Sequence, residues 1–148
     1  VDTNPKRLEA AKDAGFEHTV ANASDSTVGQ WDVVIDCTGV VPAIEDGLTR
    51  VKPGGYFQHF GVAGTDAVAR YSPFRVYRDE ITIVGTMASL SSFDRAVPLL
   101  ADGVLKAEAM ISHYFTLDDY SQAMDMFKAG TGRKLQIRPG AESSGVLI

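Results

Sequence analysis

The stretch WDVVIDCTGVVPAIEDGLTRVKPGGYFQHFGV, residues 31–62, decides the fold class. It opens with an apolar run whose β-branched residues occupy consecutive positions, as is typical of a strand covered on both faces. Pro42 suits the first turn of a helix, and Ile44, Leu48 and Val51 then recur at helical spacing. The glycines of KPGG permit a turn into a second strand, YFQHFGV. The stretch therefore predicts a strand, a helix and a second strand.

Helices and strands alternate on both sides of this unit. Asn4 and Pro5 suit the cap and first turn of a helix that Gly15 ends, and residues 18–21 predict a short strand. Further strands are predicted at residues 80–86, 111–115 and 134–138, and helical patterns that begin at residues 91 and 116 separate them. The alternation predicts an α/β fold with a mainly parallel, doubly wound sheet, whose ligands lie beyond the carboxyl ends of its strands.

The composition is that of a folded domain. The chain has 148 residues, of which 45% are hydrophobic and 22% are charged, and we expect residues 1–138 to form the domain and residues 139–148 a frayed tail. The net charge of -5 and the lack of a Lys or Arg run argue against nucleic-acid and anionic-membrane partners. The single cysteine, Cys37, excludes an internal disulfide and suits a cytoplasmic location.

Asp2 is the first candidate for a binding role. In doubly wound folds an acid at the end of the second strand accepts hydrogen bonds from the adenosine ribose, and it lies about 20 residues past a glycine-rich phosphate turn. Such a charge would repel a 2′-phosphate and favour NAD over NADP, and Arg7 is one turn into the following helix. The alternative is that Asp2 only caps this helix.

Three strand ends carry small residues that would let a flat ring approach the backbone. They are DCTG at residues 36–39, FGVAG at residues 60–64 and GTMAS at residues 85–89. Each alone is typical of a tight turn. Because parallel strands end at the same edge of a sheet, the three together predict a binding edge.

The ordered series of these segments resembles the C-terminal, coenzyme-binding half of zinc-dependent medium-chain alcohol dehydrogenases, above all the polyol and sugar-alcohol members. The resemblance covers residues 1–20, 31–64, 78–103 and 111–137. It implies that the complete enzyme uses NAD and zinc to oxidise a secondary alcohol to a ketone. It also implies which residues bind the cofactor. The adenosine would contact Asp2, Arg7, Cys37, Thr38 and Val40, the nicotinamide carboxamide would contact Val62, Thr86 and Ala88, and the pyrophosphate would contact Lys134.

The resemblance also defines what the chain lacks. In that family the residues before Asp2 form the first strand, the glycine-rich turn and most of the second strand, so we expect an incomplete Rossmann-like sheet. No GxGxxG motif occurs, and His18, His59 and His113 are scattered. No set of three zinc ligands has a plausible spacing, so we expect no catalytic or metal-binding residue in this chain.

Two other functions stay open at this point. WDVVIDCTG followed by RVKPGGYF also resembles the later strands of methyltransferases. A non-catalytic role is the other, in which the edge strand between Glu80 and Thr86 pairs with a second copy of the chain.

Overall fold

The computed structural model describes residues 1–87, 92–104 and 110–147. These residues fall into two compact units, Val1–Leu90 and Ser91–Ile148, which are described separately.

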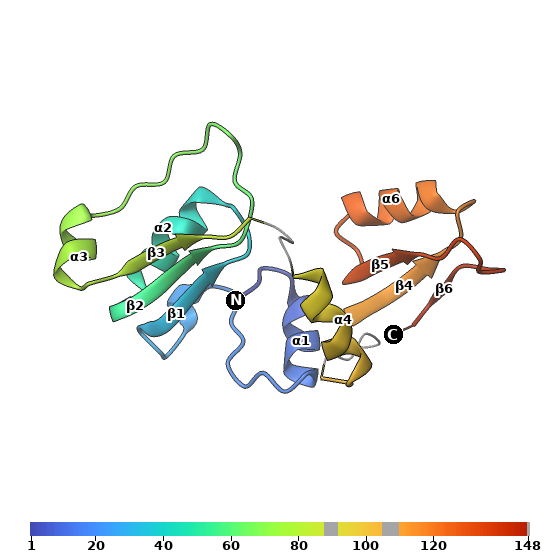
Figure 1. Ribbon diagram of the computed structural model, residues 1–148, viewed down its shortest axis with the longest axis horizontal. Coiled ribbons are helices and arrows are strands. Elements are labelled where there is room, and N and C mark those ends of the chain that lie inside the picture. Colours follow the sequence, from blue (N-terminus) through green and yellow to red (C-terminus); the bar gives the residue numbers. More distant parts are fainter. Residues whose placement is uncertain (88–91, 105–109, 148) are drawn as a thin grey trace. The chain divides into compact units, whose positions relative to one another are not determined.

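The first unit contains a parallel sheet of three strands. They are β1 (Trp31–Asp36), β2 (Val51–His59) and β3 (Thr82–Gly85), in the order β1-β2-β3. Helices α2 (Val41–Thr49) and α3 (Pro73–Arg78) lie in the connections between these strands (Figure 1). The predicted strand, helix and strand over residues 31–62 are confirmed, as is the α/β class with a parallel sheet.

The KPGG segment differs from its prediction, because it lies inside β2 and not before it. The register with β1 shifts between Trp31, opposite Val51, and Val33, opposite Tyr56. Gly54 has a φ of 72°, so its lack of a side chain allows β2 to bulge at this point.

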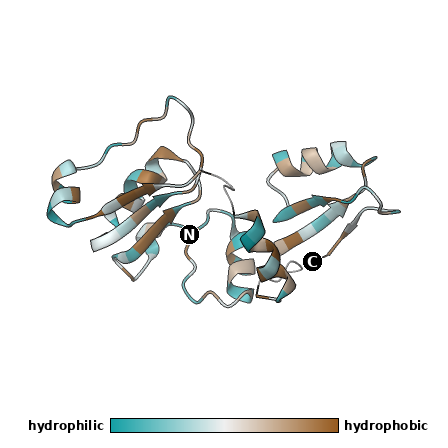
Figure 2. Ribbon diagram, viewed as in Figure 1, coloured by the Kyte–Doolittle hydropathy of each residue, from teal (hydrophilic) through white to brown (hydrophobic). Residues whose placement is uncertain are grey.

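One face of this sheet holds the core. Leu48 and Ile44 of α2 pack with Val51 and Phe57 of β2, and both β2 side chains are fully buried. The prediction that the first strand is covered on both faces is wrong for the described residues, since Val33 is 54% exposed on the opposite face. Figure 2 shows the hydrophobic residues along β1 and β3.

The N-terminal segment forms helix α1 (Pro5–Asp13), as predicted. The Asn4 side chain caps it by accepting a hydrogen bond from the Lys6 N–H. The strand predicted for residues 18–21 is wrong. The segment makes one backbone hydrogen bond, from the Asp2 N–H to the Val20 carbonyl, but no strand pairing follows from it. It leads to Asn22, whose side chain caps the short helix η1 (Ala23–Asp25).

The second unit has a sheet of its own, so the expectation of one sheet for all strands is wrong. Helices α4 (Phe93–Ala101) and α6 (Tyr120–Lys128) accompany β4 (Ile111–Phe115), β5 (Lys134–Ile137) and β6 (Gly145–Val146). The order is β5-β4-β6, in which β4 is parallel to β5 and antiparallel to β6.

The last residues are paired and not frayed, which corrects the sequence prediction. The Ser144 hydroxyl donates to the Asp119 carboxylate at 2.5 Å and accepts from the Thr116 N–H at 3.0 Å. The predicted capping box is only half formed. The Asp119 N–H donates to the Thr116 hydroxyl at 3.3 Å, but the reciprocal bond is missing because the Thr116 N–H donates to Ser144, and Asp119 itself is the N-cap of α6. These bonds hold the tail against β4 and the start of α6. Within the part of the chain that the structure describes, no helix has the length and apolar character to cross a membrane.

Candidate functional site

The three strands of the first sheet end at the same edge. In the register Asp36 lies opposite His59, and His59 lies opposite Gly85. The residues that end these strands and follow them, 36–40, 59–62 and 85–86, are called the rim below. Five of the predicted cofactor-binding residues lie in the rim, namely Cys37, Thr38, Val40, Val62 and Thr86.

Asp36 organises the first turn of the rim. Its side chain is buried, and Oδ1 accepts hydrogen bonds from the Thr38 N–H at 2.9 Å and the Thr38 hydroxyl at 2.6 Å. The Gly39 N–H donates to Oδ2 at 3.0 Å. The Thr38 oxygen in turn accepts a bond from the Val40 N–H at 3.0 Å. One carboxylate therefore fixes the backbone of the whole turn.

These bonds set the charge state of Asp36. Burial of the carboxyl group raises its pKa, but the bonds from Thr38 and Gly39 and the nearby His59 together lower the pKa below its ordinary value of 3.8. Asp36 is therefore ionised at neutral pH, and its negative charge lies beneath the turn.

The first and second turns of the rim touch through their backbones. The Asp36 carbonyl accepts bonds from the Phe60 N–H at 3.0 Å and the Gly61 N–H at 2.7 Å. A Cβ added at Gly39, where φ is 69°, would lie 2.2 Å from the Val62 carbonyl oxygen, and one added at Gly61 would lie 2.3 Å from the Gly39 nitrogen. Glycine is required at both positions because no side chain fits between the turns.

The third strand end joins the second through two hydrogen bonds. The Thr86 N–H donates to the His59 carbonyl at 3.0 Å, and the Gln58 amide donates to the Thr86 hydroxyl at 2.6 Å. The predicted site residue Ala88 lies outside the described residues. The three strand ends thus form one connected edge up to Thr86.

The large exposed side chains of the rim are apolar, whereas the exposed Thr38 and Thr86 carry hydroxyls that are hydrogen-bonded to Asp36 and Gln58. Val40 is 54% exposed, Phe60 55% and Val62 89%, and Cys37 is an exposed free thiol. An edge with apolar side chains over closely packed backbone suits a flat, uncharged ring more than a charged group.

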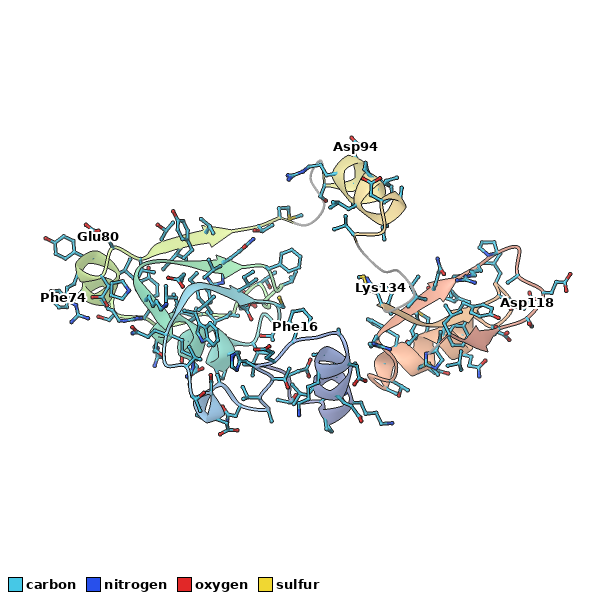
Figure 3. All side chains as sticks on the ribbon, turned by 90° about the horizontal axis from the view of Figure 1, so that it is seen from below. Phe16, Phe74, Glu80, Asp94, Asp118 and Lys134 are labelled. Carbon is cyan, nitrogen blue, oxygen red and sulfur yellow. The ribbon has the colours of Figure 1, made fainter. Side chains whose placement is uncertain are left out.

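Asp2 and Arg7 lie together at the start of α1. The Asp2 carboxylate accepts the Asn4 N–H at 2.9 Å and stands 3.7 Å from the Arg7 guanidinium. Asp2 therefore bonds to the capping residue Asn4 and does not itself cap α1, so the alternative is wrong in this form. Lys134 lies on β5 in the second unit and not on the first sheet (Figure 3).

The sequence analysis missed Asp36 as a site residue. It noted DCTG only for its small residues, although an Asp followed by Thr at the second position and Gly at the third is a pattern typical of an Asx turn. That pattern at a strand end was the available signal.

The side-chain donors do not fit a catalytic zinc ion. Among the described residues no three histidine, cysteine or acidic side chains gather closely enough to hold a metal. Catalytic zinc takes three protein ligands, so no chemical step through zinc can be assigned to these residues.

Comparison with known proteins matches residues 1–102 to the family model of zinc-binding dehydrogenases. The chain is 32% identical over 109 residues to D-arabinitol dehydrogenase 1 of Uromyces fabae, which covers 74% of this chain and 31% of the relative. It is 26% identical over 149 residues to the sorbitol dehydrogenase of Rattus norvegicus, which covers 93% of this chain and 41% of that protein.

The solved structures agree with this match. A protein of Sinorhizobium meliloti described as a zinc-binding dehydrogenase, with NADP bound, superposes with a TM-score of 0.81 at 25% identity. The superposition covers 93% of this chain and 44% of that protein. This chain spans less than half the length of the relatives that it matches. The methyltransferase-like alternative is excluded, and the chain belongs to the zinc-binding dehydrogenase family.

Proposed function

We propose that this chain is the NAD-binding portion of a zinc-dependent dehydrogenase that oxidises a secondary alcohol, of the polyol or sugar-alcohol class, to a ketone. The observation that carries the proposal is the connected rim of the first sheet, with its large exposed apolar side chains, in a chain of this family. The relatives named for D-arabinitol and sorbitol support the substrate class. When bound, the dinucleotide supplies the hydride acceptor for this oxidation.

In this proposal the rim holds the two ring systems of the dinucleotide. Cys37, Thr38 and Val40 border the adenine and its ribose, and Val62, Thr86 and Ala88 offer backbone groups to the nicotinamide carboxamide. Because the Thr86 N–H already donates to His59, the group that Thr86 offers is its carbonyl oxygen. Lys134, on β5 of the second unit, is a separate candidate for binding the pyrophosphate.

The test of the rim is NAD⁺ binding measured by calorimetry with two variants. We expect Val62→Asp to weaken NAD⁺ binding about tenfold, because it places a negative charge and a desolvation cost at the ring-binding edge. Val68→Asp is the matched control, since Val68 is also exposed and lies further along the same connection. Equal affinities for both variants would contradict the proposed rim.

Asp2 and Arg7 hold the adenosine ribose in this proposal, and the charge of Asp2 selects NAD over NADP. Asp2→Ser should reduce the ratio of NAD⁺ to NADP⁺ affinity about tenfold by removing repulsion of the 2′-phosphate. Asp13→Ser, at the other end of α1, should leave the ratio unchanged. A chain that prefers NADP⁺ before any substitution would contradict this role.

The catalytic zinc belongs to the complete enzyme, so the 148-residue chain should not turn over. Zinc-dependent NADH production from purified chain with a polyol would contradict it.

Two organisational predictions accompany the proposal. Residues 1–138 would act as the partial dinucleotide-binding domain, with residues 139–148 as its tail. A cytoplasmic location is supported by the single cysteine.

Self-association is a second candidate function, favoured by the edge position of β3. In the described sheet β3 pairs with β2 alone, so its other edge can accept a strand from a second copy. Light scattering should show a dimer that Val84→Lys in β3 weakens, while Tyr56→Lys on the central strand does not. A strictly monomeric chain at high concentration would contradict self-association.

A further inference from the structure

In the turn at residues 37–40, the N–H groups of residues 38–40 all donate to side-chain oxygens of the turn and of Asp36. The N–H groups of Thr38 and Gly39 donate to the Asp36 carboxylate at 2.9 Å and 3.0 Å, and the Val40 N–H donates to the Thr38 oxygen at 3.0 Å. The Thr38 hydroxyl donates to the same carboxylate.

Neighbouring backbone N–H groups that converge in a turn make a site for an anion. Here the anion is a side chain of the turn itself, because the Asp36 carboxylate is buried beneath the turn and only 6% of the residue is exposed. A phosphate at this turn would find its N–H groups already hydrogen-bonded and would be repelled by the negative charge of Asp36. The turn therefore presents the exposed side chains of Cys37, Thr38 and Val40 and no free N–H at residues 38–40.

Asp36 also connects this turn to the next one. Its carbonyl accepts the Phe60 and Gly61 N–H groups, and Gly39 lies against the Val62 carbonyl. A shift of the first turn is thus transmitted to Val62, the most exposed apolar residue of the rim.

We propose that Asp36 is a positioning residue of the nucleotide edge, which shapes the turn and, by filling its N–H groups, closes it to phosphate and leaves it to the uncharged adenosine. This inference rests on the proposed NAD-binding function and defines which part of the nucleotide the turn accepts. It assigns to Asp36 no contact with the ligand.

The test follows the amide resonances of Thr38, Gly39 and Gly61 while the full chain is titrated with adenosine and, separately, with inorganic phosphate. In the unsubstituted chain adenosine should shift these amides and phosphate should not. A response of the Gly39 amide to phosphate would overturn the proposal without any variant.

Asp36→Asn replaces the oxygen that accepts the Gly39 N–H with an amide that cannot accept it. Adenosine affinity of the folded chain should fall about tenfold or more, as expected for one lost hydrogen bond to a charged group. Asp32→Asn is the matched control, because Asp32 lies on the same strand with an 85% exposed side chain paired to Lys52. Equal adenosine affinity for Asp36→Asn and the unsubstituted chain would overturn the positioning role.

Asp36→Ala removes the carboxylate that accepts the N–H groups of the turn. In this variant phosphate should shift the Gly39 amide resonance, an effect that a merely structural role of Asp36 would not produce. A folded Asp36→Ala chain without this shift would overturn the proposal. If this variant does not fold, the titrations of the unsubstituted chain and of Asp36→Asn decide. If the unsubstituted chain does not bind adenosine, the proposed NAD-binding function of the rim is contradicted. The phosphate titrations would still decide whether Asp36 closes the turn to phosphate.

Discussion

The first unit contains two closely packed regions, which are stabilised by different interactions. Under α2 the core consists of apolar side chains, with Phe57 and Val51 fully buried and Ile44 and Leu48 nearly so. At the rim the turns are held by one buried carboxylate and by backbone contacts at two glycines. The stability of the core depends on buried apolar surface, whereas the shape of the rim depends on individual hydrogen bonds and close backbone contacts.

This difference separates stability from binding. A change in the core should lower the free energy of unfolding. The affinity of the chain that remains folded for the nucleotide should stay unchanged. A change at the rim should alter affinity even where the chain stays folded. The following variants test this separation, in order of expected effect.

Phe57→Ala should have the largest effect on stability. Phe57 is fully buried, so truncation should reduce the free energy of unfolding by about 3–5 kcal/mol through lost burial and a cavity. Phe74→Ala is the control, because Phe74 is 64% exposed. Chemical denaturation measures both, and equal losses would contradict the assignment of the core.

Gly39→Ala should cost about 2–4 kcal/mol and also abolish nucleotide binding, because its Cβ would lie 2.2 Å from the Val62 carbonyl oxygen. Gly54→Ala isolates the backbone term, since Gly54 also has a positive φ, of 72°, but nothing lies within 4 Å of its Cβ position. We expect about 1–2 kcal/mol for Gly54→Ala without loss of affinity. If the two variants behave alike in denaturation and calorimetry, the contact between the turns is not important.

Asp36→Asn should lower stability at neutral pH by about 1–3 kcal/mol, the cost of an unsatisfied buried group. Because folding lowers the pKa of Asp36, its stabilising effect is complete above the ordinary pKa of 3.8 and is lost as the pH falls through the folded pKa. Thermal unfolding of both chains should therefore show a difference that shrinks below about pH 4. A difference that is constant with pH would contradict an ionised Asp36.

Ile35→Ala should have the smallest effect. Ile35 lies on the open face of β1 and is 52% exposed, so truncation should cost less than about 1 kcal/mol and leave binding unchanged. A loss comparable to that of Phe57→Ala would show that this face is covered in solution.

The sequence predicted the core better than the rim. The helical spacing of Ile44 and Leu48 in α2 follows from burial, which acts on whole segments and leaves a periodic pattern. The consecutive apolar residues of β1 correctly predicted a strand but wrongly predicted that both of its faces are covered. The same pattern suggested a strand at residues 18–21, but polar capping by Asn22 prevailed there. Periodicity also could not reveal that β4 and β5 form a separate sheet, since pairing depends on distant contacts.

At the rim the small residues of DCTG and FGVAG predicted the edge but not how it is held. The Asx-turn pattern of DCTG could have identified the bonds from Asp36 to Thr38 and Gly39, but not the contact with Gly61, which depends on how the two turns lie in space. Lys134 was joined to the other cofactor residues by family resemblance alone, and it lies in the second unit.

The most direct test of the nucleotide edge is to titrate the isotopically labelled chain with NAD⁺ and map the amides that shift. We predict that the largest changes fall at residues 37–40, Val62 and Thr86, with small changes along α2 and α3. Saturable NAD⁺ binding whose shifts leave these residues unmoved, or no binding at all, would contradict the account.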